Sequence, residues 1–375
     1  MQVVLKKLAS TLDLIDVSDS VPEEVNLVIV YGNPFSIEDP LLLQNLIEAY
    51  PNAKVVGCSS AGESLNGESY ENSIVFAAIN FEKTSVKRAR VDLPRKNKNE
   101  FQSGVDLANQ LAGDNLAMIL LLSEGLSIDC DELMDGVRSV LGPNAPVYGG
   151  LAGDDLTFTH TVVLDNQGPS SNSVVAVGLY GDSLRYETHA SSFSDKDGVT
   201  IEVTKAKGNV IFEINDKPAL EVYESIIASQ CNQDAMASLH FPLMILDRDT
   251  GEDLYVRTMH EFDKDNKSIL AAATVPEGPA KVMNLLDVKD FIEDAGQTAN
   301  HLSKNKCQLA LVISCAGRRG AMGEKWVKEQ PEIFKKLGVN EMIGFYAYGE
   351  IGKSHNDKTT IIHNQTVNIA TIYEV

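Results

Sequence analysis

The feature that most constrains the fold of this chain is a supersecondary unit that occurs three times. Each copy opens with an apolar run and continues with a segment that has helical apolar spacing. The opening runs are "NLVIVY", "NLAMILLLSEG" and "QLALVISCAGRRG", which begin at residues 26, 115 and 308. The helical segments are 39–50, 131–141 and 329–337. Short runs rich in Val and Ile are typical of strands buried in a sheet, so the unit predicts strand–helix–strand.

Each copy ends its second apolar run in a glycine-rich turn that carries an acid. The three turns are "VVGCSSAGE", "VYGGLAGDD" and "GFYAYGEIG". Aligned on Gly57, Gly149 and Gly344, the turns share the pairs Gly62-Glu63, Gly153-Asp154 and Gly349-Glu350. Glycine permits positive φ and close approach of two backbones, and a carboxylate accepts nearby N–H groups. We therefore interpret these residues as structural turn or ligand positions, which are repeated because the backbone needs the same shape in each copy.

Cys58 lies inside the first turn and raises the alternative of a catalytic nucleophile. The matching positions in the other two copies are Gly150 and Phe345, so the thiol is not part of the repeated pattern. No histidine lies near it in sequence to act as a base. We interpret Cys58 as a small buried thiol. Catalysis by Cys58, Cys315 or the turn carboxylates would require an ordered nucleophile–base pair or a metal-ligand spacing. The sequence shows neither pattern, so we expect a protein that is not an enzyme.

The repeated units predict an α/β protein with mixed β-sheets covered by helices. Between the second and third copies the pattern changes. Residues 184–277 form short alternating runs separated by turns, which is typical of β-rich structure. No long flexible linker is visible, so we predict two domains packed together, over residues 1–182 and 183–375.

The composition excludes several classes of protein. The net charge of −21 argues against a nucleic-acid partner, because phosphate binding requires clustered Lys and Arg. No segment approaches the ~18 apolar residues of a membrane span, and the first twenty residues lack the apolar core of a signal peptide. Five cysteines without paired short spacing argue against a disulfide framework or a cysteine zinc site. We expect a cytoplasmic protein without membrane insertion.

The three turns, together with "VTKAKGNVIFEINDKPALEVY", "LYVRTMHEFD" and "SCAGRR", resemble the FIST family. In that family a FIST-N and a FIST-C domain form a sensory pair in bacterial signal transduction. The resemblance spans nearly the whole chain and implies a FIST-N-like domain over 1–182 and a FIST-C-like sensory domain over 183–375. A chain of this size without a kinase, cyclase or receptor domain resembles the stand-alone NosP-type members. These bind haem, sense nitric oxide and control a partner histidine kinase.

A haem b cofactor, which this resemblance implies, needs an axial ligand such as histidine in an apolar pocket. His301, His355 and His363 lie in polar or turn-associated sequence, and we discount them. His240 precedes "FPLMIL", and His260 lies in "VRTMHEF" on what should be the next strand. Two strands joined by a short turn place their side chains near one pocket. We predict His240 as the iron ligand with His260 as the alternative, and a structural role competes at both positions.

Arginine side chains offer anchors for an anionic group. Arg257 and Arg318, with Arg319 beside it, suit haem propionates or the carboxylate of an amino acid, which is the alternative ligand. A competing interpretation is that they neutralise the turn acids. Aromatic residues of the second and third turns either form the floor of a ligand site or pack in the core. These are Tyr148, Phe345, Tyr346 and Tyr348.

The two leading function classes share one kind of mechanism, a shift in population between two states. In a haem sensor, nitric oxide weakens the bond between iron and histidine, and the freed strand changes the surface shown to the kinase. Without haem, the chain is a binding module for an amino acid or another small carboxylate. Either class requires a protein partner, and a homodimer is left open.

Overall fold

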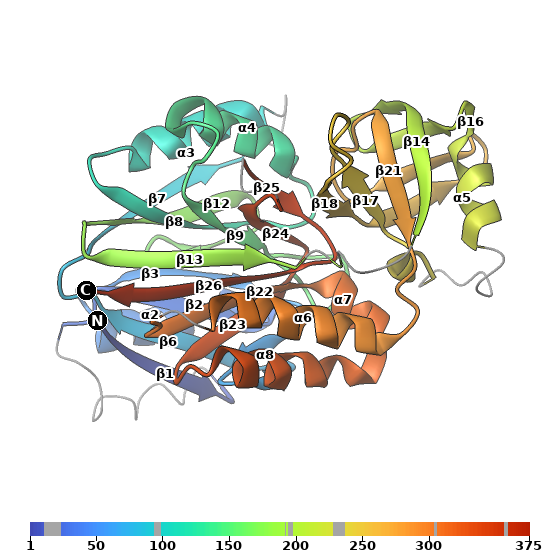
Figure 1. Ribbon diagram of the computed structural model, residues 1–375. Helices are drawn as coiled ribbons and strands as arrows, with labels where there is room; N and C mark the ends of the chain where they lie inside the picture. The colour runs from blue at the N-terminus through green and yellow to red at the C-terminus, as the bar shows by residue number, and fades with distance from the viewer. Residues whose placement is uncertain are drawn as a thin grey trace.

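The computed structural model describes residues 1–10, 24–93, 99–191, 193, 198–227, 237–303, 306–355 and 359–375. Within these residues the fold is α/β, with mixed sheets covered by helices, which confirms the predicted class. Figure 1 shows two packed parts, which we call the main body (described residues of 1–191 and 284–375) and the small domain (described residues of 198–283). No helix of the described residues is long and apolar enough to cross a membrane.

The first repeat contributes the parallel pair β2 and β3 to a sheet of order β1-β6-β2-β3-β10-β11. The strands are β1 (Gln2–Leu8), β2 (Leu27–Gly32), β3 (Lys54–Ser59), β6 (Ile74–Asn80), β10 (Val163–Asp165) and β11 (Gly168–Ser170). Two helices connect β2 to β3, namely α1 (Pro34–Glu38) and α2 (Pro40–Ala49). Asn33 and Asp39 begin these helices by accepting backbone N–H groups of the first turn, and each helix has Pro in its first turn.

The second repeat builds a sheet of order β25-β24-β9-β8-β12-β7, in which β8 and β9 are parallel. The strands are β7 (Ser85–Asp92), β8 (Leu116–Ser123), β9 (Val147–Leu151), β12 (Ser173–Tyr180), β24 (Gly349–Lys353) and β25 (Thr360–His363). Helices α3 (Glu100–Leu111) and α4 (Cys130–Leu141) cover one face of it.

The third repeat builds a sheet of order β13-β26-β22-β23-β4-β5, with β22 and β23 parallel. The strands are β4 (Glu63–Leu65), β5 (Glu68–Tyr70), β13 (Leu184–Ala190), β22 (Leu309–Cys315), β23 (Met342–Ala347) and β26 (Val367–Glu374). The helical segments are α6 (Val288–Leu302), α7 (Ala316–Met322), η3 (Gly323–Lys328) and α8 (Glu329–Leu337).

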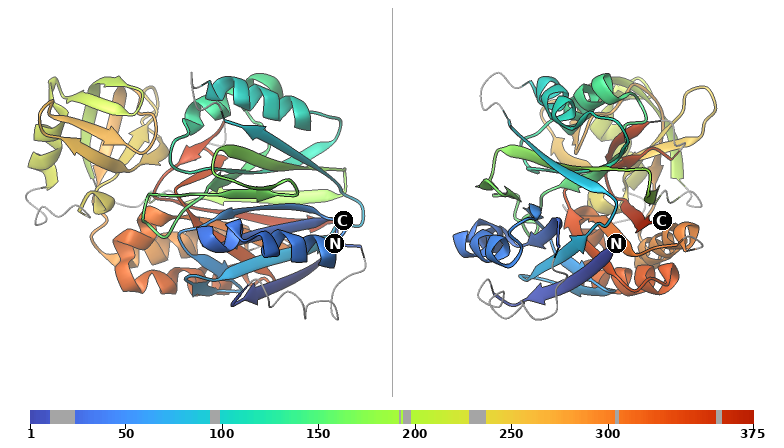
Figure 2. Two further views of the ribbon diagram at one scale, coloured as in Figure 1. Left: turned by 180° about the vertical axis from the view of Figure 1, so that it is seen from behind. Right: turned by 90° about the vertical axis from the view of Figure 1, so that its left-hand side faces the viewer.

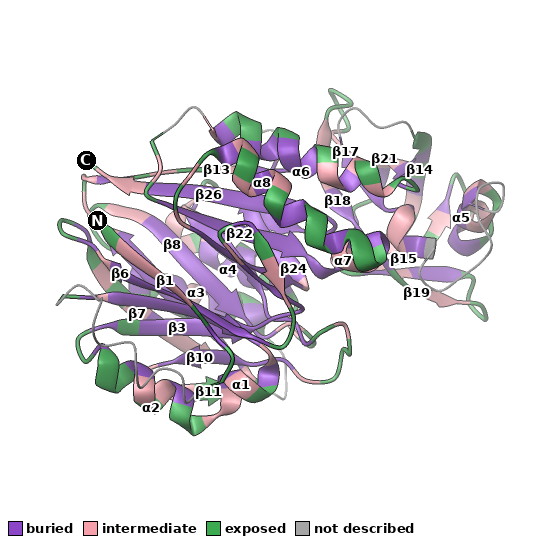
Figure 3. Ribbon diagram, turned by 90° about the horizontal axis from the view of Figure 1, so that it is seen from below, coloured by how far each residue is buried: buried purple, intermediate pink, exposed green. Residues whose placement is uncertain are grey.

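The three repeats exchange hairpins in a ring. Strand β10 of the second repeat pairs with β3 of the first, and β24 of the third repeat pairs with β9 of the second. Strand β4 of the first repeat closes the ring by pairing with β23 of the third. The inner faces of all three sheets bury one shared apolar cluster, and Figure 3 shows most of these strands as buried. Because helices cover the outer faces, the central strands are apolar on both sides, as their sequences predicted.

The aligned glycines of the repeat have a steric cause. Gly57, Gly149 and Gly344 each lie against a backbone carbonyl of the neighbouring parallel strand, at the same register in every repeat. A Cβ at any of them would collide with that carbonyl. Gly62 has φ +118°, a conformation that favours glycine. The repeated glycines are therefore required by the packing of the strands and by the turn that leaves them.

Glu63 and Glu350 are buried where an exchanged hairpin begins. Glu63 accepts hydrogen bonds from Ser60 Oγ and from Ser73 N and Oγ, the last at 2.8 Å. Glu350 accepts from Thr366 N and Oγ1, the latter at 2.9 Å. Burial raises the pKa of Glu63 to about 7 and that of Glu350 to about 8, although these hydrogen bonds act in the opposite direction.

Asp154 does not occupy the equivalent place in the second repeat. Glu63 pairs in register with Phe345 and Glu350 with Gly150, but the residue that faces Cys58 is Val163. The second repeat's hairpin begins to pair with β3 only at Val163, nine residues after Asp154. The extra residues form a loop that contributes to the site described below.

The small domain consists of one twisted, mainly antiparallel sheet and a short helix. Its strands are β14 (Gly198–Lys207), β15 (Val210–Ile214), β16 (Lys217–Pro218), β17 (Leu243–Leu246), β18 (Asp253–Arg257), β19 (Met259–Asp263), β20 (Ser268–Ala271) and β21 (Gly278–Met283). Its helical segments are α5 (Ala219–Ile227) and η2 (Ala237–His240). Figures 1 and 2 show it at the end of the main body opposite the two chain termini, beside β24, β25 and α7.

The raised pKa of Glu63 predicts a pH-dependent stability. An unfolded Glu has a pKa near 4.5, so the folded chain holds this proton more tightly. Raising the pH from 4.5 to about 7 then lowers the free energy of unfolding, by up to about 3 kcal/mol from this group. Glu63→Gln keeps a neutral side chain and flattens this decline. The measurement is urea unfolding at several pH values, with the exposed Glu48→Gln as control; equal declines in wild type and Glu63→Gln contradict the expectation.

Candidate functional site

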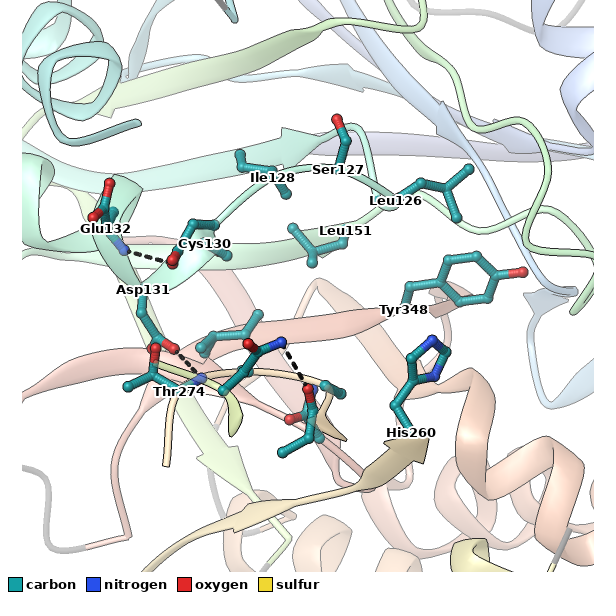
Figure 4. A pocket seen from close by; sticks show the side chains of 18 of the residues that line it. Leu126, Ser127, Ile128, Cys130, Asp131, Glu132, Leu151, His260, Thr274 and Tyr348 are labelled. Carbon is teal, nitrogen blue, oxygen red and sulfur yellow. Dashed lines mark hydrogen bonds between the residues drawn. The ribbon is translucent and has the colours of Figure 1, made fainter. Parts of the chain in front are cut away.

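A pocket of about 700 Å³ lies between the main body and the small domain (Figure 4). This volume is typical of small-molecule sites. The main body provides the segment that follows β8, the start of α4 and the hairpin β24–β25, and the small domain provides β19 and the end of β20. The lining residues include Glu100, Leu126, Asp129, Asp131, Glu132, Phe158, His260, Ala272, Thr274, Tyr348, Ile362 and Asn364. The walls therefore come from segments far apart in the sequence.

An aromatic pair forms one wall of the pocket. The rings of Phe158 and Tyr348 stack at 4.6 Å between centroids with an interplanar angle of 14°. His260 lies beside them, with its ring centroid 5.9 Å from that of Phe158. Phe158 is 51% exposed, so part of its ring is available to a ligand in the pocket.

Asp154 holds this aromatic pair in place. Its carboxylate accepts the backbone N–H groups of Phe158, Thr159 and His160 at 2.9, 2.6 and 2.7 Å, and it also accepts the Tyr348 hydroxyl. Burial raises the pKa of Asp154, but the hydrogen bonds outweigh it, and the net pKa is lowered. The loop needs this support, because Phe158 has φ +54°, which is strained for a non-glycine residue. The predicted turn acid thus acts as a positioning residue for the pocket.

Acids form the opposite wall, at the start of α4. Asp129 caps this helix by accepting the backbone N–H of Glu132 at 3.1 Å. Asp131 accepts the backbone N–H of Thr274 at 2.8 Å and lies 3.5 Å from a guanidinium nitrogen of Arg257. Both of these partners belong to the small domain. Asp131 therefore joins the two parts at the edge of the pocket.

Arg257 connects the small domain to the main body. It is 2% exposed and lies behind Asp131, outside the pocket lining. It donates to the carbonyl oxygens of Thr274 and Ile362 at 2.8 and 2.9 Å, and its guanidinium lies 4.2 Å from the ring centroid of Tyr255. Arg257, which was predicted to anchor a ligand, thus donates to protein acceptors in both the small domain and the main body.

Arg318 belongs to α7 and lies outside the pocket lining. It is fully buried and forms ion pairs with Glu329 and Asp294 at 2.7 and 2.8 Å. It also donates to the carbonyl oxygens of Phe291 and Gln365 at 2.6 and 3.3 Å. Its partners are thus not the repeated turn acids, and its donors all face protein groups.

The two candidate histidines do not share a pocket. His240 lies in η2, not on a strand, and its Nδ1 is 2.8 Å from the Leu285 carbonyl oxygen. His260 lies on β19, is exposed and lines the pocket. Strand β17, which follows His240, pairs with β18 and β21, whereas β19 pairs with β20. Segment η2 nevertheless lies close to β19, and of the two histidines only His260 belongs to the described pocket lining.

Of the four turn aromatics, Tyr348 alone lines the pocket among the described residues, and Tyr148, Phe345 and Tyr346 are buried in the main body. Sequence analysis did not identify Phe158, Asn364 or the acids at the start of α4. A partial signal was present, since Asp129 precedes a helical pattern as a capping residue does. Their convergence depends on the hairpin exchange and was not readable from local patterns.

Comparisons with known proteins agree with the resemblance seen in the sequence. The family model described as FIST N domain matches residues 26–217, and the model described as FIST C domain matches residues 219–353. This chain belongs to the FIST family. FIST domains are sensor modules of signal transduction. The predicted domain boundary at residue 182 stays a prediction; β13, which follows it, pairs with β26 in the main body.

Among solved structures, the FIST chain is similar to two cyanuric acid hydrolases. The enzyme from A. caulinodans is 9% identical with a TM-score of 0.37, and the match covers 99% of this chain and 98% of that chain. A second cyanuric acid hydrolase is 10% identical with a TM-score of 0.37, and the match covers 100% and 99% of the two chains. We draw no functional argument from likeness at this level. No curated protein matches the sequence.

The contacts of Arg257 predict a large loss of stability when its charge is removed. Arg257→Met removes the donor of the Thr274 and Ile362 carbonyl oxygens and the cation beside Asp131, so we expect the free energy of unfolding to fall by roughly 3 kcal/mol. Arg248→Met is the control, because Arg248 is an exposed arginine of the same domain, 3.6 Å from Glu202, and should cost less than about 1 kcal/mol. Urea unfolding measures both. Similar losses in the two variants contradict the junction role of Arg257.

Proposed function

We propose that this FIST protein is a sensor that binds a small organic molecule in the pocket between the main body and the small domain. One observation carries the proposal: a cavity of ligand size has walls from both parts, with Phe158 and Tyr348 on one side and Thr274 on the other. A molecule that contacts both walls favours one arrangement of the two parts over others. Its effect is limited by the difference in its affinity for the two arrangements.

The polar junction beside the pocket supports this mechanism. Asp131 lines the pocket and also holds Thr274 and Arg257 of the small domain. A ligand that competes for Asp131, or that reinforces its contact with Thr274, changes the strength of the junction. The resulting change in surface is what a partner would detect. A histidine kinase as that partner and a cytoplasmic location rest on the family resemblance alone.

A binding role accounts for the chain better than catalysis does. The thiols of Cys58 and Cys315 are buried, and burial raises the pKa of both well above the ordinary value. Neither lines the pocket. A thiolate is the reactive form of cysteine, so these environments oppose nucleophilic chemistry. The turn acids Glu63 and Glu350 are likewise enclosed by their hydroxyl partners.

Haem is the second candidate ligand, and His260 is the observation that favours it. Its imidazole faces the pocket beside Phe158 and Tyr348, which fits an axial ligand next to an apolar macrocycle. The fit is partial, because the described lining residues include four acids and no Lys or Arg to pair with propionates. Haem bound there would supply an iron that responds to a gas such as nitric oxide.

The binding proposal predicts that filling the pocket abolishes capture of a metabolite. Ala272 is exposed and lines the pocket, so Ala272→Trp should fill it without disturbing the buried sheet. Purified protein is incubated with a bacterial metabolite extract, washed, and its bound small molecules are identified by mass spectrometry. We expect a molecule retained by wild type and lost from Ala272→Trp. The control is Ala49→Trp at the exposed end of α2, which should retain it. Equal retention by all three proteins, or by none, sinks the proposal.

The haem proposal predicts a spectral response that depends on one histidine. Adding haemin to the purified protein should shift the Soret band, and His260→Ala should remove the shift. His240→Ala is the matched control and should retain it, because His240 lies outside the pocket lining. Absorption spectra measured during titration give the result. No shift, or a shift that persists in His260→Ala, excludes haem ligation by this residue.

A further inference from the structure

The charged side chains that line the pocket are carboxylates. Glu100, Asp129, Asp131 and Glu132 belong to the lining, and none of the described lining residues is Lys or Arg. Burial and the nearby acids, with Asp129 and Glu100 foremost, raise the pKa of Glu132, which reports a region of negative potential. The chain as a whole carries a net charge of −21, which adds to the attraction for cations.

A buried acceptor without a donor lies in the same lining. Asn364 is 2% exposed, and its Oδ1 has no hydrogen-bond partner among the described residues. This oxygen is enclosed by protein atoms, so it does not contact a ligand directly. Its partial negative charge lies beside the pocket and adds to the negative potential of the acids.

The aromatic wall matches a cation as well. Phe158 exposes half of its surface while it stacks on Tyr348, and both rings belong to the pocket. The face of an aromatic ring is negative and attracts ammonium groups. Asp154 fixes the loop of Phe158 and the hydroxyl of Tyr348, so this face is presented in one orientation.

We propose that the pocket selects an organic cation, a small molecule with at least one protonated amine. The ammonium group lies among the acids at the start of α4, and the carbon skeleton packs on Phe158 and Tyr348. This inference rests on the proposed ligand-binding function and assigns the chemical class of the ligand. An amine takes the place of the carboxylate that was the alternative ligand expected from the sequence, since Arg257 and Arg318 donate to protein groups.

The test compares ligands of matched shape and different charge. Calorimetry with 1,4-diaminobutane and phenethylamine is compared with 1,4-butanediol and succinate. We expect both amines to bind at least about ten-fold more tightly than the diol and succinate, as charge-assisted hydrogen bonds would produce. Raising NaCl from about 50 to about 500 mM should weaken amine binding. Amine binding no tighter than that of the diol or succinate overturns the proposal.

Variants locate the binding. Glu132→Gln removes an exposed lining acid and should weaken amine binding about three-fold or more, whereas Glu252→Gln, in the exposed turn between β17 and β18, should leave it unchanged. Amine binding that is equal in Glu132→Gln and wild type places the amine elsewhere and overturns the proposal.

The metabolite experiment separates this inference from the function on which it rests. Captured molecules that are anionic or neutral, and that Ala272→Trp loses, establish the pocket and refute the cation. Captured amines that Ala272→Trp loses support both. Absence of any capture refutes the binding function itself.

Discussion

The structure depends on the exchange of short hairpins between the three repeats. Beside each parallel pair, the next strand comes from a different repeat: β10 in the first sheet, β24 in the second and β4 in the third. A buried strand edge must find partners for its N–H and C=O groups, and these strands provide them. Glu63 and Glu350 stand at the entry to two of the exchanged hairpins, where each accepts a hydrogen bond from a neighbouring hydroxyl group and burial favours its protonated form.

The candidate site follows from the same exchange. Hairpin β24–β25 belongs to the third repeat, yet it completes the sheet of the second and lies beside α4. Tyr348 precedes this hairpin, and the carbonyl oxygen of Ile362 on β25 accepts a hydrogen bond from the guanidinium of Arg257. The small domain therefore docks where two repeats meet, and the pocket opens at that junction. Asp131 and Asp154 serve there as a link between domains and as a support for the aromatic wall.

Local patterns in the sequence predicted the parts of the fold that local physics controls. The repeats, the fold class and the aligned glycines were visible because buried strands need apolar runs and a close backbone approach excludes a Cβ. The hairpin exchange was not visible, because it pairs strands such as β4 and β23, which are far apart in sequence and have no distinguishing composition. The loop insertion after Asp154 was hidden by its similar Gly-Asp pair. Phe158 and Asn364 come together only in the folded ring.

The ring of exchanged hairpins also bears on how such a chain could have arisen. A single repeat on its own would hold a parallel pair with an open edge and a hairpin with nothing to join. Three identical short chains would give each parallel pair its neighbouring strand by passing one hairpin each to the next, as a closed cyclic trimer does. Fusing them into one polypeptide preserves the cyclic exchange of hairpins and allows the sequence of each copy to diverge. The small domain then needs to pack against only one of the three junctions between repeats.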